Sequence, residues 1–85
     1  MRYTATELTI KATKVWVEKD EIYILLNDEN EIHFPMANNK KLRFATQSQL
    51  ANVEIIAGGT GLHWAELDED LSVIGIMEGR YGYSV

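Results

Sequence analysis

The sequence predicts a small single domain of the α+β class, an antiparallel β-meander of about five strands in total with two or three short helices. Three observations lead to this class. Apolar and polar residues alternate between polar turns in the first part of the chain, which is typical of strands. The sequence Thr46-Gln47-Ser48-Gln49 fits a helix capping box. The length of 85 residues allows one domain with a nearly continuous core.

Three strands are predicted in the first part of the chain. They span Lys11–Val17, Glu21–Leu26 and Glu31–Phe34. Lys19-Asp20 separates the first two strands, and residues 27–30 form the second turn, because Asn and Asp tolerate a left-handed backbone and bond their own main chain. Pro35 ends the third strand, since proline cannot donate to a ladder.

The middle of the chain mixes helical and extended segments. Asn38-Asn39 is expected to cap a short helical turn through Leu42 and Phe44. The elements expected after it are a helix from Gln47 to near Asn52, a strand over Val53–Ala57, a glycine turn over Gly58–Gly61 and a returning strand over Leu62–Trp64.

The last element combines strand-like composition with helical spacing. Leu71, Ile74 and Met77 recur at helical intervals behind an acidic run, so we expect a helix over residues 71–78 with Gly79 as its stop. Asp68 or Asp70 is the expected cap. Gly75 within the helix suggests that another backbone passes close by.

Composition and charge narrow the function. The net charge of −5 and a single basic cluster, Lys40-Lys41 with Arg43, argue against nucleic-acid binding by this chain alone. We expect no secretory signal peptide and no membrane span, and the absence of cysteine suits the cytoplasm. No serine stands in a nucleophile-elbow pattern, so we predict a non-enzymatic protein without a cofactor.

The acidic segment Glu66–Asp70 invites a comparison with a calcium loop. Asp68, Asp70 and Ser72 begin like such a loop, but its glycine should then fall at Val73 and its bidentate glutamate at Gly79. The spacing therefore favours acids that support a helix start over a calcium site.

The two histidines provide the alternative hypothesis, a small-ligand or metal-binding domain. His63 with Asp68 and Asp70, joined by His33, could supply imidazole and carboxylate ligands. Nothing in their spacing requires this arrangement, and His63 is expected beside Trp64 in a strand, half-buried and hydrogen-bonded.

Aromatic residues point instead to a protein partner. Trp16, Tyr23, Trp64, Tyr81 and Tyr83 exceed what a small core needs, and Trp and Tyr dominate interface hot spots. The tail over residues 80–85 is expected to dock on its own domain in preference to a partner. The candidate interaction surface consists of His63, Trp64, Glu66, Asp68, Glu69, Asp70, Tyr81 and Tyr83.

The strings Leu62-His63-Trp64 and Leu67-Asp68-Glu69-Asp70-Leu71-Ser72-Val73, followed by Gly75, resemble the end of a bacterial family, domain of unknown function 2442. The similarity spans roughly residues 10–79 and implies a small α+β domain without established catalytic residues. This chain departs from the family at two turns. Family members often carry a glycine in the turn formed here by residues 27–30, and many carry a proline where this chain has Lys40-Lys41. Some members continue into a helix-turn-helix domain. Because the sequence ends at Val85, we do not expect the function of that domain to carry over.

The resemblance also suggests a partner. Genes of this family are often paired with a second small gene, in arrangements similar to toxin–antitoxin modules. An acidic protein would suit a basic partner, because complementary charge speeds and orients association. We therefore expect a protein-interaction module, antitoxin-like, with a partner encoded by a neighbouring gene; self-association is compatible with the sequence, and a dimeric DNA-binding regulator is the weakest hypothesis.

Overall fold

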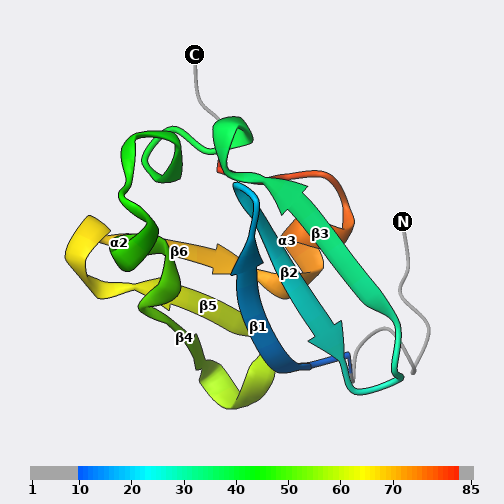
Figure 1. Cartoon of the computed structure of the whole chain (residues 1–85). Helices are drawn as coiled ribbons and strands as arrows, with labels where there is room; N and C mark the ends of the chain where they lie inside the picture. The colour runs from blue at the N-terminus through cyan, green and yellow to red at the C-terminus, as the bar shows by residue number, and fades with distance from the viewer. Residues whose placement is uncertain (1–9, 83–85) are drawn as a thin grey trace.

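The computed structural model describes residues 10–82, which form two three-stranded antiparallel sheets, ordered β1-β2-β3 and β4-β5-β6 (Figure 1). The strands span Ala12–Glu18 (β1), Glu21–Leu26 (β2), Glu31–Pro35 (β3), Val53–Ile56 (β4), Gly61–Trp64 (β5) and Glu69–Ser72 (β6). The two α-helices are Gln47–Ala51 (α2) and Val73–Met77 (α3), and four short 3-10 turns complete the described elements: Met36–Asn38 (η1), Leu42–Phe44 (η2), Ala57–Gly59 (η3) and Ala65–Leu67 (η4). The predicted α+β class is confirmed, with six strands within residues 10–82 in place of the expected five or so.

The first sheet is the meander expected from the sequence. Ile22, Ile24 and Leu26 of β2 are buried and alternate with partly exposed neighbours, as period-two patterning predicts. Lys19 and Asp20 both have positive φ and form a two-residue hairpin, whose backbone twist suits the flanking strands. In the second turn Asn30 donates its backbone N–H to Asp28 Oδ1 over 3.0 Å, while Glu29 takes the left-handed conformation.

The second sheet contains a strand that the sequence did not predict. Glu69–Ser72 forms β6, antiparallel to β5, where an acidic approach to a helix was expected. Glu69 and Leu71 are buried, while Asp70 and Ser72 are exposed. A charged residue at a buried position hid this period-two pattern from hydrophobicity alone.

The capping box and the glycine turn are confirmed. Thr46 Oγ1 accepts from Gln49 N over 3.1 Å, and Gln49 Oε1 accepts from Thr46 N over 2.9 Å, so both ends of the box are made. Residues 57–60 connect antiparallel β4 and β5 as a hairpin, although β4 ends at Ile56 because Ala57 already has positive φ.

Helix α3 is shorter than predicted and has a different cap. Ser72 Oγ accepts from Gly75 N over 2.8 Å, so the expectation that Asp68 or Asp70 caps this helix is wrong. Asp68 lies in a left-handed turn position and Asp70 lies within β6, so both come before the cap residue Ser72. Gly79 has positive φ and donates to Ile76 O, so it stops the helix as predicted.

The close approach at Gly75 comes from the helix's own cap. A Cβ at Gly75 would stand 2.6 Å from Ser72 Oγ and 3.7 Å from the carbonyl oxygen of Arg80. The expectation of a backbone passing close by therefore holds only as an ordinary contact with the returning chain, and the tight contact is a side chain.

One hydrophobic core joins both sheets. Figure 1 shows β4–β6 behind β1–β3, with α2 and α3 at opposite ends of β6. The fully buried side chains include Ile22, Ile24, Phe34, Leu42, Leu50, Leu62, Trp64 and Val73. No helix within residues 10–82 is long and apolar enough to cross a membrane.

Candidate functional site

The acidic corner of the molecule, which we define as Glu66, Asp68 and Asp70 with His63, lies on β5, β6 and the turn between them. The register of the second sheet pairs Glu54 with His63 and His63 with Asp70, so these three residues form one row. Their neighbours Trp64 and Leu62 point to the core, which places the row on the outward face.

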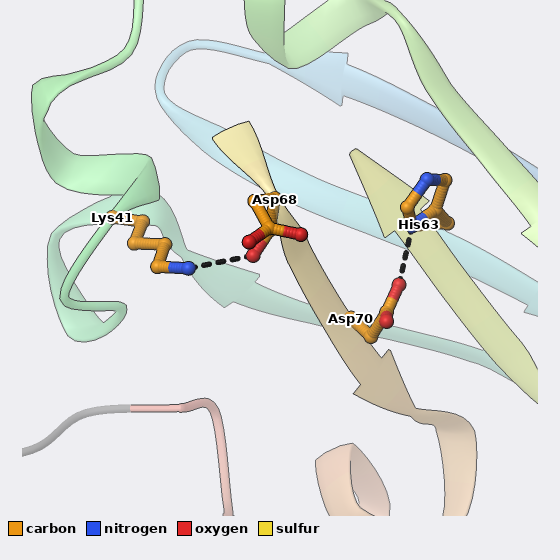
Figure 2. A network of polar contacts seen from close by, with 4 residues as sticks. All are labelled: Lys41, His63, Asp68 and Asp70. Carbon is orange, nitrogen blue, oxygen red and sulfur yellow. Dashed lines mark hydrogen bonds and ion pairs between the residues drawn. The ribbon is translucent and has the colours of Figure 1, made fainter. Parts of the chain in front are cut away.

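His63 and Asp70 form the central contact of this corner. His63 Nδ1 is hydrogen-bonded to Asp70 Oδ1 across the two strands (Figure 2). The side chains are 31% and 68% exposed, so His63 is half-buried as predicted, whereas Asp70 faces solvent. The pair fixes the imidazole on the sheet and leaves the carboxylate accessible from outside.

Asp68 is presented by its backbone conformation. It follows η4 with φ 50° and ψ 49°, a left-handed geometry that aspartate tolerates better than most residues. Lys41 Nζ donates to the main-chain oxygen of Asp68 over 2.6 Å, so the ammonium holds the turn through the carbonyl and not through the carboxylate (Figure 2). Within residues 10–82, no ion pair to the Asp68 carboxylate is found.

Two predicted surface residues do not belong to the surface. Trp64 is 1% exposed and donates its indole N–H to the carbonyl oxygen of Leu50 over 3.1 Å. Glu69 is 8% exposed and accepts from Asn39 Nδ2 over 2.7 Å. Their placement on the candidate interaction surface is wrong, because strand alternation turns both toward the interior.

Asn39, which was expected only as a cap, forms a buried polar junction. Its side chain is fully buried, and Oδ1 accepts from the backbone N–H groups of Lys41 and Leu42, each over 2.8 Å. Its Nδ2 donates to Glu69 Oε2 and to Tyr81 O, each over 2.7 Å. Asn39 therefore bonds the backbone at the start of η2, as the sequence suggested, but the N-cap residue of that turn is Lys41, which makes no side-chain cap bond. The link from Asn39 to β6 and the C-terminal segment has no sequence signal.

The C-terminal segment docks on its own domain as far as the structure describes it. Tyr81 stacks on Phe34 with ring centroids 5.0 Å apart and an interplanar angle of 3°. Lys40 N donates to Gly82 O over 3.4 Å. Tyr83 lies outside the described residues.

The structure does not bring the two histidines together. His33 lies on β3 of the first sheet, where Nδ1 contacts Glu21 Oε1 at 2.6 Å, while His63 contacts Asp70 on the second sheet. A shared site of His33, His63 and Asp68 is therefore wrong. Across residues 10–82, no group of three His, Cys, Asp or Glu side chains is arranged to hold a metal ion.

Comparisons with known proteins place the chain among structures of similar shape. A family model described as "Protein of unknown function (DUF2442)" matches residues 12–82. The chain is similar to a crystal structure of a protein of unknown function from Rhodospirillum rubrum, with a TM-score of 0.81 and 34% identity over 88% of this chain and 93% of that one. It is also similar to the solution NMR structure of an uncharacterized protein from Chromobacterium violaceum, with a TM-score of 0.75 and 30% identity over 87% of this chain and 70% of that one. No curated protein matches the chain.

Proposed function

The chain belongs to the DUF2442 family, and on that premise we propose that it is a non-enzymatic protein-interaction module of the cytoplasm, antitoxin-like, which binds a basic protein encoded by a neighbouring gene. The observation that supports this proposal best is the acidic corner. Asp70 is 68% exposed and Asp68 and Glu66 are exposed as well, on elements anchored to the core.

The corner suits recognition because its acidic side chains face solvent from a paired strand and the turn before it. Lys41 engages a carbonyl oxygen near the corner, so it holds the turn without occupying the Asp68 carboxylate. Clustered acidic groups attract and orient a basic partner, and the net charge of −5 acts in the same direction.

Co-purification with the product of the neighbouring gene tests the proposal. The neighbouring product is tagged in the native host, and this chain is expected in the eluate at moderate salt. The double variant Asp68→Asn with Asp70→Asn is expected to lower the affinity of the purified pair about tenfold, mainly through slower association.

A matched variant separates a local effect from a change in net charge. Asp28→Asn with Glu29→Gln removes the same two charges from the exposed β2–β3 turn and is expected to leave the affinity within about twofold. Recovery of the tagged product without this chain, or an equal loss in both double variants, would refute a partner site at the acidic corner.

A further inference from the structure

A ladder of three aromatic rings crosses the outward face of the first sheet. The register pairs Trp16 with Tyr23 and Tyr23 with His33, so one ring from each strand stands in a row. The ring centroids of Trp16 and Tyr23 are 5.6 Å apart with an interplanar angle of 11°, and those of Tyr23 and His33 are 5.0 Å apart with an angle of 20°. We call Trp16, Tyr23 and His33 the ring ladder.

The ring ladder takes no part in the hydrophobic core. The core side of β2 is made by its buried residues, and neither Trp16 nor Tyr23 is among the side chains packed against the core. Trp16 and Tyr23 remain partly exposed, and the His33 side chain is 52% exposed. Large aromatic rings gathered on an outward sheet face are typical of binding surfaces.

Carboxylates stand on both sides of the ring ladder along the strands. Glu18 and Glu21 pair with each other in the row before the rings, and Glu31 pairs with Leu25 in the row after them. Lys14, which also pairs with Leu25, is the one basic residue that these pairings place in the two flanking rows. The three acids therefore outnumber the base around the rings.

Contacts within the described residues tie these acids to the rings. Trp16 Nε1 donates to Glu18 Oε1 over 3.3 Å, and His33 Nδ1 contacts Glu21 Oε1 at 2.6 Å. Desolvation, together with the nearby charges of Glu21, Glu18 and Glu31, raises the pKa of the Tyr23 phenol above 10.0. The acids thus lie close enough to set the electrostatic environment of the central ring.

We propose that the ring ladder binds a cationic segment of a protein partner, whose arginine or lysine stems lie on the rings while their charged ends reach Glu18, Glu21 and Glu31. Long basic side chains cover apolar surface with their stems and keep their heads polar, which matches rings flanked by acids. The flanking rows lie two residues to either side of the rings, or about 13 Å apart in total. Basic residues four positions apart in an extended segment span the same distance.

This surface is separate from the acidic corner, and it rests on the proposed function only for the protein from which the segment comes. Its test therefore uses the chain alone with a synthetic probe. The probe is a capped peptide of about nine residues in which arginine alternates with threonine, so that arginines share one side of an extended segment. Matched peptides carry lysine or glutamine at the arginine positions.

The two tryptophans provide a reporter and an internal control in one NMR spectrum. The indole N–H of Trp16 belongs to the ring ladder and is bonded to Glu18, whereas that of Trp64 is buried and bonded to Leu50 O. Titration with the arginine peptide is expected to shift the Trp16 signal saturably and to leave Trp64 in place. The glutamine peptide is expected to shift neither signal.

Substitutions at the flanking acids and base give the sign of the interaction. The double variant Glu18→Gln with Glu31→Gln is expected to lower the affinity for the arginine peptide about three- to tenfold. Lys14→Gln removes a positive charge instead and is expected to raise this affinity about twofold. Unchanged spectra of Trp64 confirm that each variant is folded.

Four results would overturn the proposal. These are no Trp16 shift at millimolar peptide, equal shifts with the glutamine peptide, equal affinities for all variants, and a Trp16 signal that moves with protein concentration alone, which assigns the face to a second copy of the chain. If the neighbouring gene product does not bind this chain but the Trp16 signal still responds to the arginine peptide, the proposed function is refuted and the binding role of the ring ladder is retained.

Discussion

Two neighbouring acids of β6, Glu69 and Asp70, lie in opposite environments. Glu69 is 8% exposed and receives a hydrogen bond from the fully buried Asn39, whereas the Asp70 side chain is 68% exposed and is bonded to His63 on the outward face. A single step along a strand turns a side chain from one face to the other. Acidity in this segment therefore does not by itself mark a binding site, because Glu69 stabilises the fold whereas Asp70 faces solvent.

The largest loss of stability is expected at the buried hydrogen bond between Asn39 and Glu69. Asn39→Ala removes the acceptor of two backbone N–H groups and leaves the Glu69 carboxylate without its buried donor. We expect the free energy of unfolding to fall by about 3 kcal/mol in urea denaturation.

The adjacent residue supplies the control. Asn38 is exposed in η1, and Asn38→Ala is expected to change the free energy of unfolding by less than about 0.5 kcal/mol. Equal losses in the two variants would contradict the role assigned to the buried junction.

A side chain added at Gly82 is expected to disturb the same junction of Asn39 and Glu69. Gly82 has a φ of 77°, and a Cβ there would stand 2.6 Å from Asn39 Nδ2 and 2.9 Å from Glu69 Oε2. Gly82→Ala is expected to destabilise by about 2 to 3 kcal/mol, because it combines backbone strain with a clash.

Gly58 separates these two causes. It has a φ of 65° but open space around the added Cβ, so Gly58→Ala is expected to cost about 1 kcal/mol from strain alone. Thermal denaturation of both variants measures the difference, and equal losses would mean that the junction accommodates the extra methyl group.

The smallest changes in stability are expected from substitutions of the two β6 acids themselves. Glu69→Gln keeps an oxygen for Asn39 but loses a charge-assisted hydrogen bond, so we expect a loss of about 1 kcal/mol. Asp70→Asn, on the exposed face, is expected to stay within about 0.5 kcal/mol while it weakens partner binding. A stability loss for Asp70→Asn as large as that for Glu69→Gln would remove the distinction between the two acids.

The meander and the capping box were predictable because local pattern decides them. Ile22, Ile24 and Leu26 alternate with polar or partly exposed residues. The side chains of Thr46 and Gln49 each accept a hydrogen bond from the other residue's backbone N–H. Neither inference requires knowledge of what lies on the other side of the core.

The acidic corner was predictable only in part, because its geometry depends on pairing between strands. Trp64 ends a four-residue strand, too short for alternation to show which face it takes. The buried carboxylate of Glu69 has its hydrogen-bond donor in Asn39, which lies 30 residues earlier in the sequence. The ring ladder likewise depends on the register that joins Trp16, Tyr23 and His33.

The joint at Ser72 limits where this chain can change in length. Ser72 is both the last residue of β6 and the cap of α3, so strand passes into helix with no intervening residue. One added residue here would rotate α3 by about 100° and turn Val73 and Ile76 away from the core. The β2–β3 turn carries no such double duty, so insertions in this fold are expected at that turn and not at the joint.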